Sequence, residues 1–196
     1  MKKIFLLINF FFCLISYGQN NDEIDKIRNF IPDGYEVLNI TKGDLNLDSI
    51  PDLIIVLNKI GERDMYNPAP KRQLLIFFGQ SDGTYHFINK SENIVYSHDM
   101  GGVSNPFPFG WIKINDGFFS VMHSGGMGSI HMKRITTFKY SLLDKEFYLY
   151  KEEGESGQFS DNLTEINKTS IIETEADFGK LQLNKYSIYD NTIFER

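Results

Sequence analysis

The sequence contains a single cysteine, Cys13, among its 196 residues. This cysteine lies in the first eighteen residues, MKKIFLLINFFFCLISYG, which we expect to be removed from the mature protein. The mature chain then has no thiol. It therefore forms no disulfide, offers no cysteine nucleophile and holds no zinc ion through thiolates.

Basic residues are outnumbered as well. The chain has 20 Lys and Arg against 26 Asp and Glu, and its formal net charge is −6. A protein that binds nucleic acid needs a basic face to meet the phosphates, so we expect no nucleic acid among the partners. An acidic surface suits a soluble exported protein or one that binds cations.

Long apolar runs are absent except at the N-terminus. Two lysines there precede the apolar run 4–15, and Ser16-Tyr17-Gly18 places small residues at the positions read by a signal peptidase. The run is shorter than the ~20 residues that span a bilayer. We therefore expect a signal peptide over residues 1–18, export to the periplasm or the outside of the cell, and no membrane insertion after cleavage.

The remaining residues, 19–196, are rich in aromatic side chains and contain no linker, so we expect a single β-rich domain. Apolar residues recur at helical spacing in NNDEIDKIRNF, which predicts one short N-terminal helix that ends at Pro32-Asp33-Gly34. The later periodicity predicts strands at Tyr35–Ile40, Leu53–Leu57, Gln73–Phe78, Thr84–Ile88, Asn93–Tyr96, Trp111–Ile114, Phe118–His123, Ile130–Tyr140, Glu146–Tyr150 and Ser170–Thr174, with one or two more within 181–194. Many short strands favour an all-β sandwich or open barrel.

Oxygen-bearing residues alternate in the segment GDLNLDSIPDLIIVL. Asp44, Asn46, Asp48 and Asp52 occupy positions 1, 3, 5 and 9 of a loop, and Ile50 occupies position 7, where a backbone carbonyl supplies a further oxygen. Such a set suits a hard cation, and Ca²⁺ fits it better than a transition metal. The alternative is a turn rich in Asp and Asn, whose side chains cap backbone amides without any metal.

This run resembles the DxNxDGxxDL calcium loop of integrin-type FG-GAP and VCBS repeats, in which a buried strand follows the loop directly. The resemblance implies a strand–loop–strand unit that binds structural Ca²⁺ through the five residues just named. Ser49 stands where the pattern has glycine. The motif occurs once, whereas a propeller needs at least four blades, so we expect a single hairpin within another β fold. An EF-hand is excluded because Ile55 occupies position 12, where it needs an acid.

A second resemblance extends over roughly residues 30–190 and rests on four segments. It is to a group of uncharacterised bacterial exported proteins in which one calcium-type loop precedes a segment rich in Gly, Pro and aromatics. This resemblance implies an exported β-rich domain and brings no catalytic residues with it. The segments are DLNLDSIPDLIIVL, RQLLIFFGQSDGTY, GGVSNPFPFGWIKINDGFFSVMHSGGMGSIHMKRITTFKY and DFGKLQLNKYSI.

Other candidate groups are weaker. His123 and His131 flank a glycine-rich turn, and we expect loop-end histidines that titrate or form hydrogen bonds, since two imidazoles make a poor metal site. Glu152, Glu153 and Glu155 offer paired carboxylates for glycoside hydrolysis, but their polar surroundings predict a solvated loop.

These observations favour a calcium-stabilised binding or interaction module with an unidentified protein or carbohydrate ligand. One alternative is a small exported hydrolase with a cleft near residues 98–131, which would need carboxylates or histidines converging in one pocket. Another is a periplasmic inhibitor or immunity-type protein.

Overall fold

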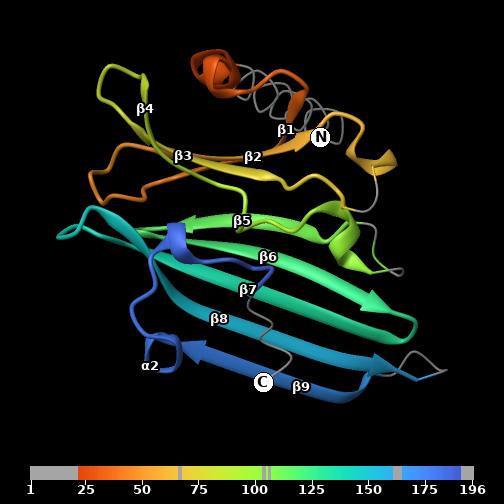
Figure 1. Ribbon diagram of the computed structural model, residues 1–196. Coiled ribbons are helices and arrows are strands. Elements are labelled where there is room, and N and C mark those ends of the chain that lie inside the picture. Colours follow the sequence, from red (N-terminus) through yellow and green to blue (C-terminus); the bar gives the residue numbers. More distant parts are fainter. Residues whose placement is uncertain (1–21, 66–67, 103–104, 106, 161–164, 191–196) are drawn as a thin grey trace, which may run out of the picture. The chain divides into compact units, whose positions relative to one another are not determined.

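The computed structural model describes residues 22–65, 68–102, 105, 107–160 and 165–190 (Figure 1). The chain divides into two compact units, residues 1–34 and 35–196. In the first unit, a short helix covers residues 22–30 and stops before the Pro32-Asp33-Gly34 turn, as the sequence predicted. The expected signal peptide, residues 1–18, lies outside the described residues. None of the described helices is both long and apolar enough to cross a membrane.

All nine described strands belong to the second unit. They are β1 (Tyr35–Gly43), β2 (Asp52–Lys59), β3 (Gln73–Gly79), β4 (Tyr85–Ser91), β5 (Phe109–Asn115), β6 (Phe118–Met127), β7 (Ile130–Ser141), β8 (Glu146–Phe159) and β9 (Glu165–Thr174). The short helical elements are η1 (Arg28–Phe30) in the first unit, and η2 (Glu62–Asp64), η3 (His98–Gly101), α2 (Glu175–Phe178) and η4 (Leu183–Lys185) in the second.

The strands form two antiparallel sheets, each a simple meander. One has the order β1-β2-β3-β4 and the other the order β5-β6-β7-β8-β9 (Figure 1). Strands make up 53% of the structure, and the described residues form neither a closed barrel nor a propeller. The prediction of an all-β fold with one short N-terminal helix is therefore confirmed, with a sandwich as the architecture.

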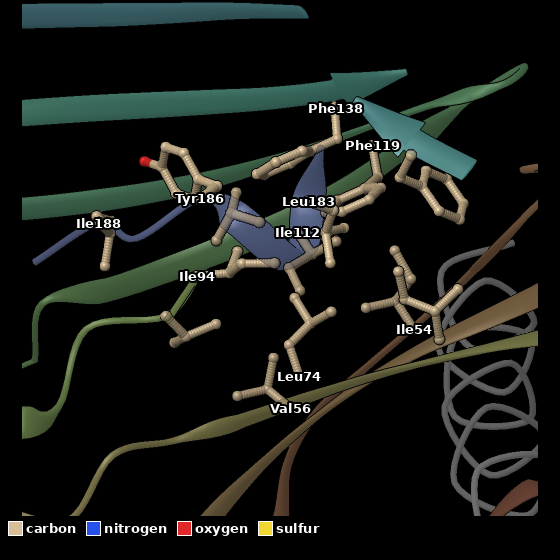
Figure 2. Close-up of a cluster of buried hydrophobic side chains, with 14 of the residues drawn as sticks. Ile54, Val56, Leu74, Ile94, Ile112, Phe119, Phe138, Leu183, Tyr186 and Ile188 are labelled. Carbon is tan, nitrogen blue, oxygen red and sulfur yellow. The ribbon is translucent and has the colours of Figure 1, made fainter. Parts of the chain in front are cut away.

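The hydrophobic core lies between the two sheets. Its side chains come from both: Ile54, Val56, Leu74 and Ile76 from the four-stranded sheet, and Ile112, Phe119, Val121, Phe138, Phe147 and Leu149 from the five-stranded sheet. Figure 2 shows Leu183, Tyr186 and Ile188 of the later chain among them. Both faces of β2 and β3 are buried, which explains why their sequences are continuous apolar runs rather than alternating ones.

Three segments differ from the sequence prediction. Asn93–Tyr96 is not a strand, although Ile94 and Val95 are fully buried. The described part of 181–194 contains only an isolated bridge between Gln182 and Tyr148 and the 3-10 turn η4. Strand β8 runs on to Phe159 instead of ending at Tyr150, because β7 and β9 both pair with its polar half.

Candidate functional site

The predicted metal loop connects β1 to β2. It begins where β1 ends at Gly43 and finishes at Asp52, the first residue of β2. Leu45 is fully buried in the core between the sheets and anchors the loop there. The carbonyl of Asp44 accepts a hydrogen bond of 3.0 Å from the amide of Gly117, in the turn between β5 and β6. The loop is therefore fastened to both sheets.

Backbone amides orient two of the loop carboxylates. Asp44 Oδ1 accepts a hydrogen bond of 2.6 Å from the Leu47 amide, and Asp44 Oδ2 accepts one of 2.8 Å from the Ser49 amide. Asp48 Oδ1 accepts one of 2.7 Å from the Ile50 amide. The two carboxylates thus cap the turns of their own loop. A carboxylate has about four lone-pair positions, so both retain acceptor capacity after these bonds are made.

Asn46 lies between these two carboxylates in the loop and touches one of them. Its Oδ1 accepts a hydrogen bond of 3.0 Å from the Asp48 amide, and its Nδ2 donates one of 2.9 Å to Asp48 Oδ2. Asn46 and Asp48 therefore lie side by side. The Asn46 side chain donates a hydrogen bond to the negatively charged Asp48, whereas a carboxylate at position 46 would repel it.

Two residues of the loop have left-handed backbone conformations. Leu47 has a φ of 65° and Ser49 a φ of 68°. Such values cost residues other than glycine roughly 1–2 kcal/mol each. Ser49 is the position at which the calcium-loop pattern has glycine, so serine takes the conformation that glycine adopts easily. The hydrogen bonds to Asp44 hold both residues in this strained form.

Asp52 has a different role from the other acids. Its side chain is fully buried, and Oδ2 accepts hydrogen bonds from the amides of Leu45 (2.7 Å) and Asn46 (3.2 Å) while Oδ1 accepts one of 2.9 Å from Gly79 of β3. Burial raises the pKa of the Asp52 carboxyl to about 6, although the Leu45 and Gly79 amides act in the opposite direction. Asp52 ties the loop to β3, and a ligand role for it stays a prediction.

The atoms of this loop that could coordinate a metal are all oxygens, which fits Ca²⁺ rather than a softer metal. Asp44, Asn46 and Asp48 lie on one short turn. Asn46 donates a hydrogen bond to Asp48, and so does the backbone amide of Ile50. Within the described part of the chain, however, no three His, Cys, Asp or Glu side chains converge closely enough to hold a metal.

A second polar group, which the sequence did not predict, lies inside the sandwich. Arg134 of β7 and Glu152 of β8 form an ion pair of 2.7 Å, and each side chain is 2% exposed. Glu152 Oε1 also accepts hydrogen bonds from Thr136 (3.1 Å) and Tyr186 (2.6 Å). Burial works against the charged guanidinium, but Tyr186 and Glu152 raise the pKa of Arg134 above its usual value. We call Arg134, Thr136, Glu152 and Tyr186 the arginine cluster.

His123 lies close to this cluster and is also fully buried. The backbone amide of Tyr96 donates a hydrogen bond of 3.3 Å to His123 Nε2, while the Tyr96 hydroxyl accepts one of 3.3 Å from Arg134. Burial, with the charges of Arg134 and Arg72, lowers the pKa of His123 to about 3. The expectation was a loop-end histidine that titrates or forms hydrogen bonds. His123 lies within β6 rather than at a loop end, and burial keeps its ring neutral, but it does form a hydrogen bond.

The expectation of a loop at Glu152, Glu153 and Glu155 is wrong, since all three lie in β8, and the expectation of solvation is wrong for Glu152 alone. Glu152 points into the sandwich, whereas Glu153 and Glu155 form half-exposed ion pairs with Lys151 (3.0 Å) and Lys133 (3.5 Å). Nothing in the local sequence distinguishes these glutamates. Only the pairing of Thr136 with Glu152 across β7 and β8 identifies the buried one.

Two cavities bear on the hydrolase alternative. One, of about 420 Å³, is lined by the glycine-rich end of β6 and β7 and includes His131, which stacks on Phe159 at 4.5 Å, but no carboxylate. The other, of about 430 Å³, is lined by Glu36, Glu62, Asp64 and His98. The Glu62 carboxylate there is engaged by a buried ion pair with Arg72, and Glu36 accepts a hydrogen bond of 3.0 Å from Asn58.

Comparison of the chain with protein-family models, with curated proteins and with solved structures gives no match in any of the three.

Proposed function

We propose that this chain is an exported binding domain, periplasmic or extracellular, in which the loop from Asp44 to Asp52 holds a structural Ca²⁺ ion. The observation that carries the proposal is the conformation of the loop. Side-chain oxygens on alternate residues are oriented by backbone amides, and Ser49 adopts the left-handed conformation of the glycine in the calcium-loop pattern. Strain of this kind persists where the surrounding structure enforces it, often at a functional site.

Asp44, Asn46 and Asp48 would hold the ion through side-chain oxygens, and Ile50 through its carbonyl. The bound ion would supply positive charge that offsets the repulsion between Asp44 and Asp48. Asp52 positions the loop from below, through its hydrogen bonds to Leu45 and Gly79. The ion would keep the loop rigid, and the ligand of the domain is a protein or a carbohydrate.

Thermal unfolding tests the calcium site. At a Ca²⁺ concentration 100-fold above the dissociation constant, binding to the folded state alone adds about 2.7 kcal/mol to the free energy of unfolding. For a domain of this size, the melting temperature then rises by roughly 5–11 °C relative to the protein in excess chelator. Asp48→Ala should abolish this rise.

Asp82→Ala is the matched control. Asp82 also caps a turn, since it accepts hydrogen bonds from Thr84, but it lies in the hairpin between β3 and β4. This variant should keep the full Ca²⁺-dependent rise. An unchanged melting temperature in the unmodified protein between Ca²⁺ and chelator would refute the metal site.

One observation favours a small exported hydrolase as the second candidate. The cavity of about 430 Å³ brings Glu36, Glu62 and Asp64 together with His98, which falls within the region 98–131. We place this candidate second because the ion pair with Arg72 engages the most buried of these carboxylates, Glu62.

A further inference from the structure

A third cleft, of about 510 Å³, lies directly beside the proposed calcium loop. Leu47, at the centre of that loop, forms one wall, and the turn between β7 and β8 forms another, together with Tyr148 and Tyr150 of β8. Glu175 of α2 and Lys180, five residues further along the chain, also line it. The volume falls in the range typical of small-molecule sites, about 300–1,000 Å³.

Backbone hydrogen bonds connect this cleft to the calcium loop. The Gly117 amide donates to the Asp44 carbonyl (3.0 Å), and the Gly117 carbonyl accepts from the amide of Tyr140 (2.8 Å), which lines the cleft. The Leu47 side chain packs against Gly117, since a Cβ atom added to Gly117 would lie 3.5 Å from the Leu47 side-chain carbons. A change in the loop would therefore move one wall of the cleft.

Aromatic rings provide a flat apolar surface in the cleft. Tyr150 is 47% exposed, and an edge-on contact of 5.0 Å with Phe118 fixes its orientation. The ring of Tyr148 is covered on one side by the Lys180 ammonium, at 4.3 Å. An exposed ring held in one orientation loses little entropy when a ligand packs on it.

Polar groups converge on the same space. Lys180 donates a hydrogen bond of 2.8 Å to Asp144 Oδ2, and the Ser141 hydroxyl donates one of 3.0 Å to the same oxygen. The hydrogen bond from Lys180 lowers the pKa of the Asp144 carboxyl, so the pair stays ionised. Adjacent acceptor and donor groups of this kind match the neighbouring hydroxyls of a sugar ring.

The charges of the cleft balance. Its lining carries two lysines, Lys139 and Lys180, and two acids, Asp144 and Glu175. A ligand with a net charge of either sign gains no overall attraction from such a set. An uncharged ligand with one apolar face and a rim of hydroxyls uses both the rings and the polar pairs.

We propose that this cleft binds a neutral oligosaccharide, with Tyr150 as the stacking platform and Asp144 and Lys180 as the hydroxyl-binding pair. This rests on the proposed function, since it names the ligand class of the same binding domain and makes Leu47 of the calcium loop one wall of its site.

Isothermal titration calorimetry of the purified protein in Ca²⁺ tests the ligand class. The probes are the neutral hexasaccharides of glucose in α-1,4, β-1,4 and β-1,3 linkage, of xylose and of N-acetylglucosamine, with hexagalacturonate and an acetylated trileucine amide as charged and peptide probes. At least one neutral hexasaccharide should bind with a dissociation constant of ~1 mM or tighter. Binding of only the charged sugar or the peptide, or of none of the probes, would overturn the proposal.

Two variants locate the site. Tyr150→Ala should weaken binding at least tenfold. Asp144→Ala should also weaken binding, and because Asp144 lies in an exposed turn, this variant tests the site even where Tyr150→Ala fails to fold. Phe159→Ala is the matched control, because Phe159 is 41% exposed on the same strand but lines a different cavity. Unchanged affinity in a folded Tyr150 or Asp144 variant would refute the site. The Ca²⁺ melting shift, measured without sugar, separates failure of the ligand class from failure of the calcium site.

Discussion

The arginine cluster and the Asp44–Asp52 loop satisfy their carboxylates in opposite ways. In the cluster, Glu152 is paired with the Arg134 guanidinium and two hydroxyl groups. In the loop, Asp44 and Asp48 are bound by uncharged backbone amides and remain partly open to solvent. The first arrangement neutralises its charge internally. The second leaves negative charge in place, which the cation site that we propose would require.

The strongest test of this contrast removes the buried charge partner. Glu152→Gln should lower the free energy of unfolding by about 3–5 kcal/mol, because it leaves the Arg134 charge buried without a counter-charge. Urea-induced unfolding measures the change. Glu155 lies on the same strand as Glu152 and pairs with the half-exposed Lys133 of β7. Glu155→Gln should therefore lower the free energy of unfolding by less than about 1 kcal/mol. Equal losses in the two variants would contradict the distinction between buried and surface pairs.

The next prediction concerns the effect of His123 on the free energy of unfolding at acid pH. Because the pKa of His123 is about 3 in the folded state and near 6.5 when unfolded, the unfolded chain binds a proton between these values and the folded chain does not. His123 therefore makes stability fall as the pH drops below 6.5. The loss attributable to it is about 2 kcal/mol between pH 7 and pH 5.

His123→Gln isolates this contribution, since glutamine keeps an acceptor for the Tyr96 amide. The variant should be less sensitive to acid than the unmodified protein by that amount, as measured by urea unfolding at both pH values. Identical pH dependence in the two proteins would mean that His123 titrates normally.

The smallest effect lies in the loop. Ser49→Gly should raise the free energy of unfolding by about 1 kcal/mol in chelator, because glycine adopts the φ of Ser49 without the steric cost, less its own loss of chain entropy. Thermal melts measure it. The same substitution at Ser141, which has no positive φ, serves as the comparison and should not stabilise the protein. A destabilised Ser49→Gly variant would argue that the serine side chain itself matters in the loop.

Local sequence predicted the sheets better than the polar interior. Apolar runs and Asp-Gly turns located β2, β3 and the β5–β6 hairpin, since each depends on residues close in the chain. Glu152 and His123 were misplaced because their burial depends on Arg134 and Tyr96, which lie far from them in the sequence. Alternation along a strand identifies two faces, but it does not tell which acidic residue lies beside a basic residue of the neighbouring strand, as Glu152 lies beside Arg134. The oxygen-bearing loop was found because its residues are contiguous, whereas the anchoring of Asp52 by Gly79 was not visible locally.

The segment from Leu181 to Tyr189 has a consequence for the order of events in folding. Tyr186 completes the hydrogen bonds of Glu152, the Ile188 carbonyl accepts from Arg134, and the Ile188 amide bonds to the Asn93 carbonyl. These contacts join residues more than thirty positions apart and close the sandwich interior. A chain emerging from the ribosome cannot complete this interior until the segment from Leu181 to Tyr189 has been made. The nine described strands therefore cannot enclose their polar interior before this later segment is available.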